Sequence, residues 1–176
     1  MSVKKIEDFS LKDALELAIQ IEMEAMERYL EFARQIGSVS EFDAGAFFLE
    51  MANNEKKHAT ELTSKKKSLY GDSECEFTIE EYYDFLEIEA PEFDKAQSFM
   101  SAEQALQVAR ASEIKAFQFF DKVSTLTSNP EVKNLFLELK QEEENHRKMI
   151  ESLLERVEKG TNQIRTDDDI DEPNGL

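Results

Sequence analysis

Two stretches of the chain decide its fold, and each repeats the other. Residues 46–63 read AFFLEMANNEKKHATELT, and residues 134–151 read NLFLELKQEEENHRKMIE. The stretches align without gaps, so that the Glu-x-x-His unit at 55–58 corresponds to the unit at 143–146. A spacing of three residues places the glutamate and the histidine on one face of a helix, one turn apart. These units contain both histidines of the chain.

A second pair of stretches repeats in the same order. Residues 14–33 align without gaps on residues 105–124, and Glu22 corresponds to Glu113. The offset of this pair is three residues longer than the offset of the first pair, as a shorter loop in the second half would produce. The repeats therefore predict a duplicated helical hairpin with pseudo-twofold symmetry.

The composition favours an all-α fold. Most of the 5 glycines and 3 prolines lie between long stretches of Ala, Leu, Glu, Lys and Gln, which are good helix formers. Ser10 and Asp13 are spaced as in a capping box, Gly37 stands where a helix would end, and Asn129-Pro130 is a typical helix start. The predicted helices cover roughly 11–36, 41–69, from 101 onward, and from 129 to near 160.

The connections between these helices predict the topology. Short loops join the first helix to the second and the third to the fourth, which makes each pair antiparallel, whereas about 30 residues separate the pairs. Two helical hairpins joined by a long crossover form the ferritin-like four-helix bundle, which we assign to residues 1–160. We expect a short extra helix at 78–81 in the crossover. Residues 161–176 are acidic and are expected to form a disordered tail.

Charge and cysteine content exclude several classes of protein. Lys and Arg number 21 against 39 Asp and Glu, and a net charge of −18 disfavours nucleic acid and anionic membranes as partners. No stretch approaches 18 consecutive apolar residues, and the N-terminus lacks the apolar run of a signal peptide. The single cysteine, Cys75, excludes an internal disulfide and a cysteine-based zinc site. We expect a soluble cytoplasmic protein with an inert Cys75.

The heptad seams of the four helices carry the candidate chemistry. Their a and d positions are apolar except in mid-helix, where carboxylates interrupt each seam. Burying four unpaired carboxylates would cost several kcal/mol each, and no Lys or Arg occupies the central seam positions. Two divalent metal ions would balance the four negative charges. One Glu from each of two helices and Glu-x-x-His from each of the others is the ligand set of dinuclear sites in helical bundles. The candidate ligands are Glu22, Glu55, His58, Glu113, Glu143 and His146.

An alternative is that glutamate-rich helices contain Glu-x-x-His units by accident. Both histidines, however, fall at equivalent positions of the repeat and in seams that are otherwise apolar, which favours the metal site. Mixed imidazole and carboxylate ligands suit two iron ions, with manganese or zinc as possible substitutes.

Three motifs resemble the erythrin domain of rubrerythrins, a family of the ferritin-like superfamily. Residues 22–33 (EMEAMERYLEFA) are similar to the first-helix motif, residues 54–59 (NEKKHA) to the second-helix motif and residues 143–146 (EENH) to the fourth. The resemblance covers about residues 10–158. It implies that Glu22 and His58 bind one iron, that Glu113 and His146 bind the other, and that Glu55 and Glu143 bridge the two ions.

Two departures from the rubrerythrin pattern affect the expected activity. Rubrerythrins carry a further glutamate one turn after the third-helix ligand, where this chain has Ala116. They also usually carry a rubredoxin domain that delivers electrons, which a single cysteine cannot build. The resemblance therefore implies that reducing electrons come from an external electron-donor protein.

The resemblance leads us to expect a non-haem di-iron oxidoreductase that reduces hydrogen peroxide in the response to oxidative stress. One alternative is a ferroxidase-like protein that oxidises iron with dioxygen and stores or delivers it. Another is an interaction module whose metal site is purely structural. A homodimer is expected, because many bundles of this kind bury an aromatic crossover against a partner, and Tyr82 and Tyr83 of the crossover can pack on the bundle or on a second subunit. A cage assembly would instead favour the iron-storage alternative.

Tyr29 is the candidate catalytic residue. It lies seven residues after Glu22 on the same seam, so its hydroxyl can donate a hydrogen bond to a ligand carboxylate or its ring can donate one electron. Its repeat equivalent is Phe120, and simple core packing is therefore an equal alternative.

Overall fold

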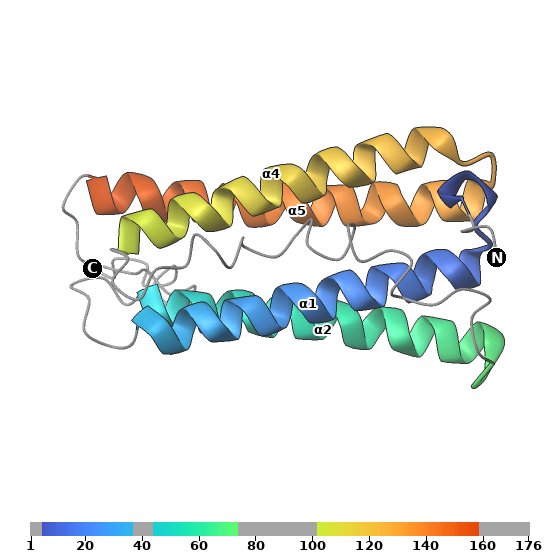
Figure 1. The fold of residues 1–176 in the computed structure, drawn as a ribbon, viewed down its shortest axis with the longest axis horizontal. Helices are drawn as coiled ribbons and strands as arrows, with labels where there is room; N and C mark the ends of the chain where they lie inside the picture. The colour runs from blue at the N-terminus through green and yellow to red at the C-terminus, as the bar shows by residue number, and fades with distance from the viewer. Residues whose placement is uncertain (1–4, 37–43, 74–101, 159–176) are drawn as a thin grey trace, which may run out of the picture.

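Four long helices account for almost all of the described structure (Figure 1). The structure, a computed structural model, describes residues 5–36, 44–73 and 102–158. A 3-10 helix, η1 (Ile6–Asp8), precedes α1 (Leu11–Ile36), α2 (Ala44–Tyr70), α4 (Ala102–Leu126) and α5 (Pro130–Glu158). The predicted all-α class is confirmed.

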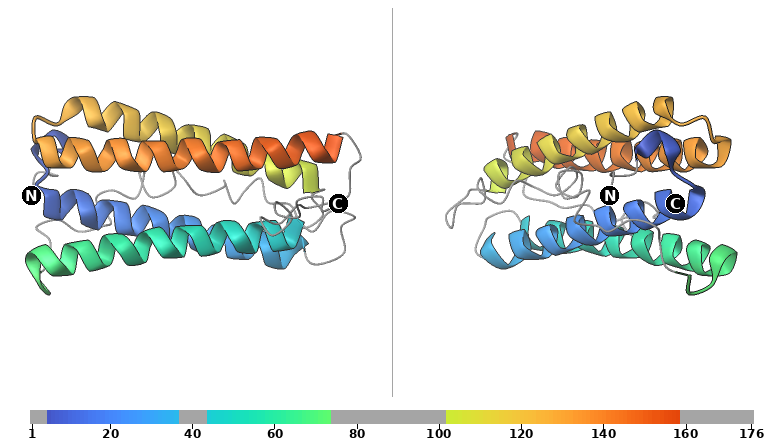
Figure 2. Two further views of the ribbon diagram at one scale, coloured as in Figure 1. Left: turned by 180° about the vertical axis from the view of Figure 1, so that it is seen from behind. Right: turned by 45° about the vertical axis from the view of Figure 1, so that its right-hand side comes forward.

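The helices form two hairpins that lie in two layers. Helix α1 packs along α2, and α4 packs along α5, in all the views of Figures 1 and 2. Contacts between α1 and α5 and between η1 and α4 join the layers. The predicted four-helix bundle of two hairpins is therefore confirmed, with the helix positions close to those expected from the sequence.

Local hydrogen bonds explain where the helices begin and end. The backbone N–H of Ser10 donates to Asp13 Oδ2 at 2.9 Å and that of Asp13 to Ser10 Oγ at 3.3 Å, which is the reciprocal pattern of a capping box. At the start of α5, the N–H of Glu131 donates to Asn129 Oδ1 at 3.0 Å. Helix α2 ends before Gly71, which takes the left-handed φ of 65° that favours glycine.

The apolar core consists of two clusters, one on each side of the mid-helix glutamates. The first apolar cluster takes residues before Glu22 in α1 and after Glu113 in α4, and includes Phe120 stacked on Phe136 at 6.2 Å between ring centroids. The second apolar cluster takes residues after Glu22 in α1 and before Glu113 in α4, and includes Phe32 stacked on Phe48 at 5.2 Å. Both clusters draw on all four helices, so their side chains hold the two layers together.

The predicted seams are confirmed by burial. Every seam residue is buried except His58, which is partly exposed. No helix in the three described ranges has an apolar stretch long enough to span a membrane. Several expectations fall outside the described residues: the crossover with its helix at 78–81, Cys75, the crossover tyrosines Tyr82 and Tyr83, and the tail at 161–176.

Candidate metal centre

All six candidate ligands meet at mid-height in the bundle. Helix α1 supplies Glu22, α2 supplies Glu55 and His58, α4 supplies Glu113, and α5 supplies Glu143 and His146. The predicted helical spacing holds in both Glu-x-x-His units, because the histidine Nδ1 lies 3.7 Å from the Glu55 carboxylate in one and 3.8 Å from the Glu143 carboxylate in the other. The two imidazole rings stack at 5.3 Å between centroids.

Contacts between helices divide the centre into two halves. In the His58 half, which consists of Glu22 and His58, the Nδ1 atom lies 3.4 Å from Glu22 Oε2. In the His146 half, which consists of Glu113 and His146, the Nδ1 atom lies 3.6 Å from Glu113 Oε2. Glu55 lies between the halves, since its Oε1 is 3.3 Å from His146 Nδ1 while its Oε2 faces His58.

The carboxylates are almost completely withdrawn from solvent. Glu22 and Glu143 are 0% exposed, and Glu55 and Glu113 are 1% exposed. Both oxygens of Glu22, Oε2 of Glu113 and Nδ1 of His146 are buried and make no hydrogen bond within the described residues. Buried charges need a counter-charge or direct ligation, because desolvation costs several kcal/mol per ion. This donor set fits a pair of metal ions bound by carboxylate and imidazole groups.

The charges of the centre shift the pKa values of its members. Burial alone lowers the pKa of His146, but the carboxylates of Glu55 and Glu113 outweigh that effect and raise it to about 9. Burial acts to raise the pKa of Glu113, whereas the nearby His146, Glu143 and Tyr29 side chains outweigh burial and hold it below its ordinary value. The charges of the centre thus favour the ionised form of Glu113 and the protonated form of His146.

Tyr29 lies beside the centre, where the sequence placed it. Its ring is 1% exposed and stacks on Phe48 at 6.0 Å, and its hydroxyl donates a hydrogen bond to Glu113 Oε1. Burial first, and then the negative charge of Glu113, raise the pKa of Tyr29 well above its ordinary value, so the hydroxyl keeps its proton. Its role as a catalytic residue stays a prediction.

Sequence reasoning missed one acidic residue at the centre. Glu142 of α5 is partly buried, and its Oε2 lies 3.9 Å from His58 Nδ1. One ligand atom from each of Glu22, His58 and Glu142 lies within 4.8 Å of the others. Glu142 is outside the heptad seam, so the seam pattern could not reveal it. Its one signal in the sequence is the run of glutamates at 142–144.

Comparisons with known proteins show the family and the fold of the chain. The family model described as Rubrerythrin matches residues 13–154 and, in a second match, residues 104–173. The crystal structure of an uncharacterised conserved protein from Magnetospirillum magnetotacticum MS-1, at 2.00 Å resolution, has a TM-score of 0.67 to this chain. The two are 25% identical, and the similarity covers 84% of this chain and 95% of the other. No curated protein matches the chain significantly.

Proposed function

Because the chain belongs to the rubrerythrin family, whose ferritin-like domain implies di-iron binding, we propose that it is a di-iron oxidoreductase that reduces hydrogen peroxide with electrons from an external donor protein. The observation that carries the proposal is the buried centre itself. Four carboxylates and two histidines from all four helices converge there, and both oxygens of Glu22 and Oε2 of Glu113 accept no hydrogen bond within the described residues.

The six side chains would act as terminal or bridging ligands. Glu22 and His58 would hold one iron and Glu113 and His146 the other, with Glu55 and Glu143 bridging. The position of Glu55 supports its bridging role, because its two oxygens face the two histidines. The four negative charges of these carboxylates equal the positive charge of two Fe²⁺ ions, so binding removes the electrostatic cost of the centre.

The protein supplies the surroundings for the reduction. Two bound Fe²⁺ ions can supply the two electrons that break the O–O bond of hydrogen peroxide, which takes up two protons to give two water molecules. The two apolar clusters limit the access of bulk water to the bundle interior on both sides of the centre. Tyr29 keeps its hydroxyl proton and holds the Glu113 carboxylate in place. The electrons are restored by a separate donor protein.

The test is stopped-flow absorbance of the anaerobic protein loaded with two Fe²⁺ ions, mixed in parallel with hydrogen peroxide and with dioxygen. A peroxidase oxidises both irons far faster with peroxide, returns to the reduced state when a reductant is added, and repeats the cycle. Faster oxidation by dioxygen would contradict the proposal.

Iron oxidation and storage is the second candidate. The net charge of −18 favours attraction of Fe²⁺, and Ala116 removes the glutamate that rubrerythrins carry after the third-helix ligand. In that case, oxidation by dioxygen would continue beyond two irons per chain. A purely structural site would instead leave the oxidation state of the iron unchanged under peroxide.

A further inference from the structure

We propose that Glu142 is an additional metal-binding carboxylate of the His58 half, and that the pocket beside it, between α2 and α5, is where divalent metal ions enter the bundle. The proposal deepens the proposed function and rests on it, since it concerns how the same centre acquires its metal. No motif in the sequence singles out Glu142.

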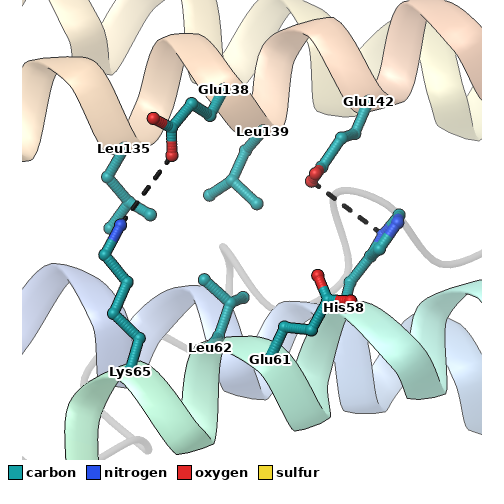
Figure 3. A pocket seen from close by; sticks show the side chains of 8 residues that line it. All are labelled: His58, Glu61, Leu62, Lys65, Leu135, Glu138, Leu139 and Glu142. Atoms are coloured by element: carbon teal, nitrogen blue, oxygen red, sulfur yellow. Dashed lines mark ion pairs between the residues drawn. The ribbon is translucent and has the colours of Figure 1, made fainter. Parts of the chain in front are cut away.

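Three carboxylates surround a single imidazole nitrogen. The His58 Nδ1 atom lies 3.4 Å from Glu22, 3.7 Å from Glu55 and 3.9 Å from Glu142. Figure 3 shows the Glu142 side chain reaching from α5 towards His58 on α2. Successive residues of a helix point about 100° apart, so Glu143 can face the bundle axis while Glu142 faces α2.

Glu22 gives an independent reason to place a cation here. Its side chain is completely buried, and neither of its oxygens accepts a hydrogen bond within the described residues. Its ion-pair contact there is His58, which is neutral when it acts as a metal ligand. An ion bound by His58 would therefore be the counter-charge of Glu22, and Glu142 is within reach of the same ion.

A pocket of about 150 Å³ opens beside these residues and could hold several water molecules. In Figure 3, His58 and Glu142 lie at one end, leucines line the middle, and Lys65 pairs with Glu138 at the other end. The Lys65 Nζ atom is 3.8 Å from Glu138 Oε2. The lining residues are His58, Glu61, Leu62, Lys65, Leu135, Glu138, Leu139 and Glu142.

Exposure falls step by step from the rim of the pocket to the centre. The side chain of Glu138 is 66% exposed, that of Glu142 is 37%, that of His58 is 16% and that of Glu22 is 0%. Carboxylate oxygens can replace the water ligands of divalent cations such as Mn²⁺, and mixed carboxylate and imidazole sites suit Fe²⁺. Glu142 is intermediate in exposure between the rim and the buried ligands, so it can bind an ion on its way from the pocket to the centre.

The variant Glu142→Gln tests the ligand role, with Glu144→Gln as the matched control. Both glutamates flank Glu143 on α5 and carry the same charge, but Glu144 pairs with Arg147 at 2.8 Å and is not in the metal-ligand groups of the described residues. Each full-length protein is titrated with Co²⁺, and bound ions are counted by visible absorbance and calorimetry. Helical content is checked by circular dichroism.

We expect the wild-type chain and Glu144→Gln to bind two Co²⁺ ions with similar affinities. Glu142→Gln should bind one ion normally and the other about tenfold more weakly or worse, the range seen when groups supporting a metal site are removed. Equal affinities in wild type and Glu142→Gln, or an equal loss in Glu144→Gln, would overturn the ligand role. A wild-type chain that binds fewer than two ions would overturn the dinuclear centre and this proposal with it, so the two failures can be told apart.

The entry route is tested by the rate of loading. Lys65→Gln removes a positive charge at the rim of the pocket without touching the buried ligands, so Co²⁺ should load about twofold faster at low ionic strength with unchanged final affinity. Lys67→Gln is the control, because Lys67 is an exposed lysine of the same helix that pairs with Asp72, and neither residue lines the pocket. Equal loading rates in the two variants would overturn entry through this pocket.

Discussion

The two halves of the candidate centre are built from repeated sequence but differ in their surroundings. In the His146 half, the histidine side chain is 4% exposed and Glu113 accepts a hydrogen bond from Tyr29. In the His58 half, the histidine is 16% exposed, and Phe120 occupies the position equivalent to Tyr29, so that Glu22 has no corresponding hydroxyl. The repeated sequence supplies the same ligands to both halves, whereas the residues beside them differ, and His58 is more exposed than His146.

A second difference lies on the Glu-x-x-His helices. Glu142 precedes the unit on α5, and its repeat equivalent on α2 is Asn54, which carries no charge. The additional carboxylate therefore serves His58 alone. Pseudo-symmetry of the ligands therefore does not imply equal metal affinity or equal access to solvent in the two halves.

Removing the shared carboxylate should have the largest effect. Glu55→Ala deletes the group that faces both histidines, so we expect the two-metal site to be lost. Metal content after desalting, measured by mass spectrometry, checks this. The control is Glu50→Ala, an exposed position on the same helix, which should keep two ions. Two ions retained in Glu55→Ala would contradict the ligand assignment.

Removing the Tyr29 hydroxyl should lower the stability of the metal-free protein. Tyr29→Phe leaves the buried Glu113 carboxylate without its donor, and we expect the metal-free protein to lose about 2 kcal/mol in the free energy of unfolding. Urea denaturation measures the loss, and two-metal binding should persist. An unchanged free energy of unfolding would contradict the view that the Tyr29 hydroxyl stabilises the Glu113 carboxylate.

Acid should weaken metal binding through His146. Its pKa of about 9 means that the imidazole of the metal-free protein is protonated at pH 7, and only the neutral form binds metal. Below that pKa, the affinity of the His146-half ion should therefore fall about tenfold for each unit of pH. Co²⁺ titrations between pH 6 and 8, with calorimetry in buffers of different ionisation enthalpy, should detect the released proton. A Co²⁺ affinity that does not change with pH would contradict the raised pKa of His146.

Adding a carboxylate at position 54 should have the smallest effect. Asn54→Glu places a carboxylate at the repeat equivalent of Glu142, and we expect the His146-half ion to bind about two- to fivefold more tightly, as for an exposed ion pair. Asn53→Glu, at the exposed neighbouring position, is the control. An equal gain in both variants would show that position 54 has no special relation to the centre.

The sequence predicted the parts of the structure that depend on local periodicity. The helix positions, the capping box at Ser10 and the buried seams follow from a repeat of about 3.6 residues and from side chain–backbone hydrogen bonds close in the chain. The meeting of the six candidate ligands followed from the same seams. Glu142 and the pocket could not be predicted, because they depend on how α2 and α5 are rotated and separated, which neither helix encodes alone.

Each apolar cluster takes residues from both hairpins, so one hairpin alone has neither a complete core nor a complete ligand set. Two identical hairpins related by a twofold axis would complete both, since an isologous pair supplies every group twice. In such an assembly, any substitution appears in both copies at once. Two copies within one chain are not bound by that constraint, so positions 29 and 120, like 54 and 142, can differ.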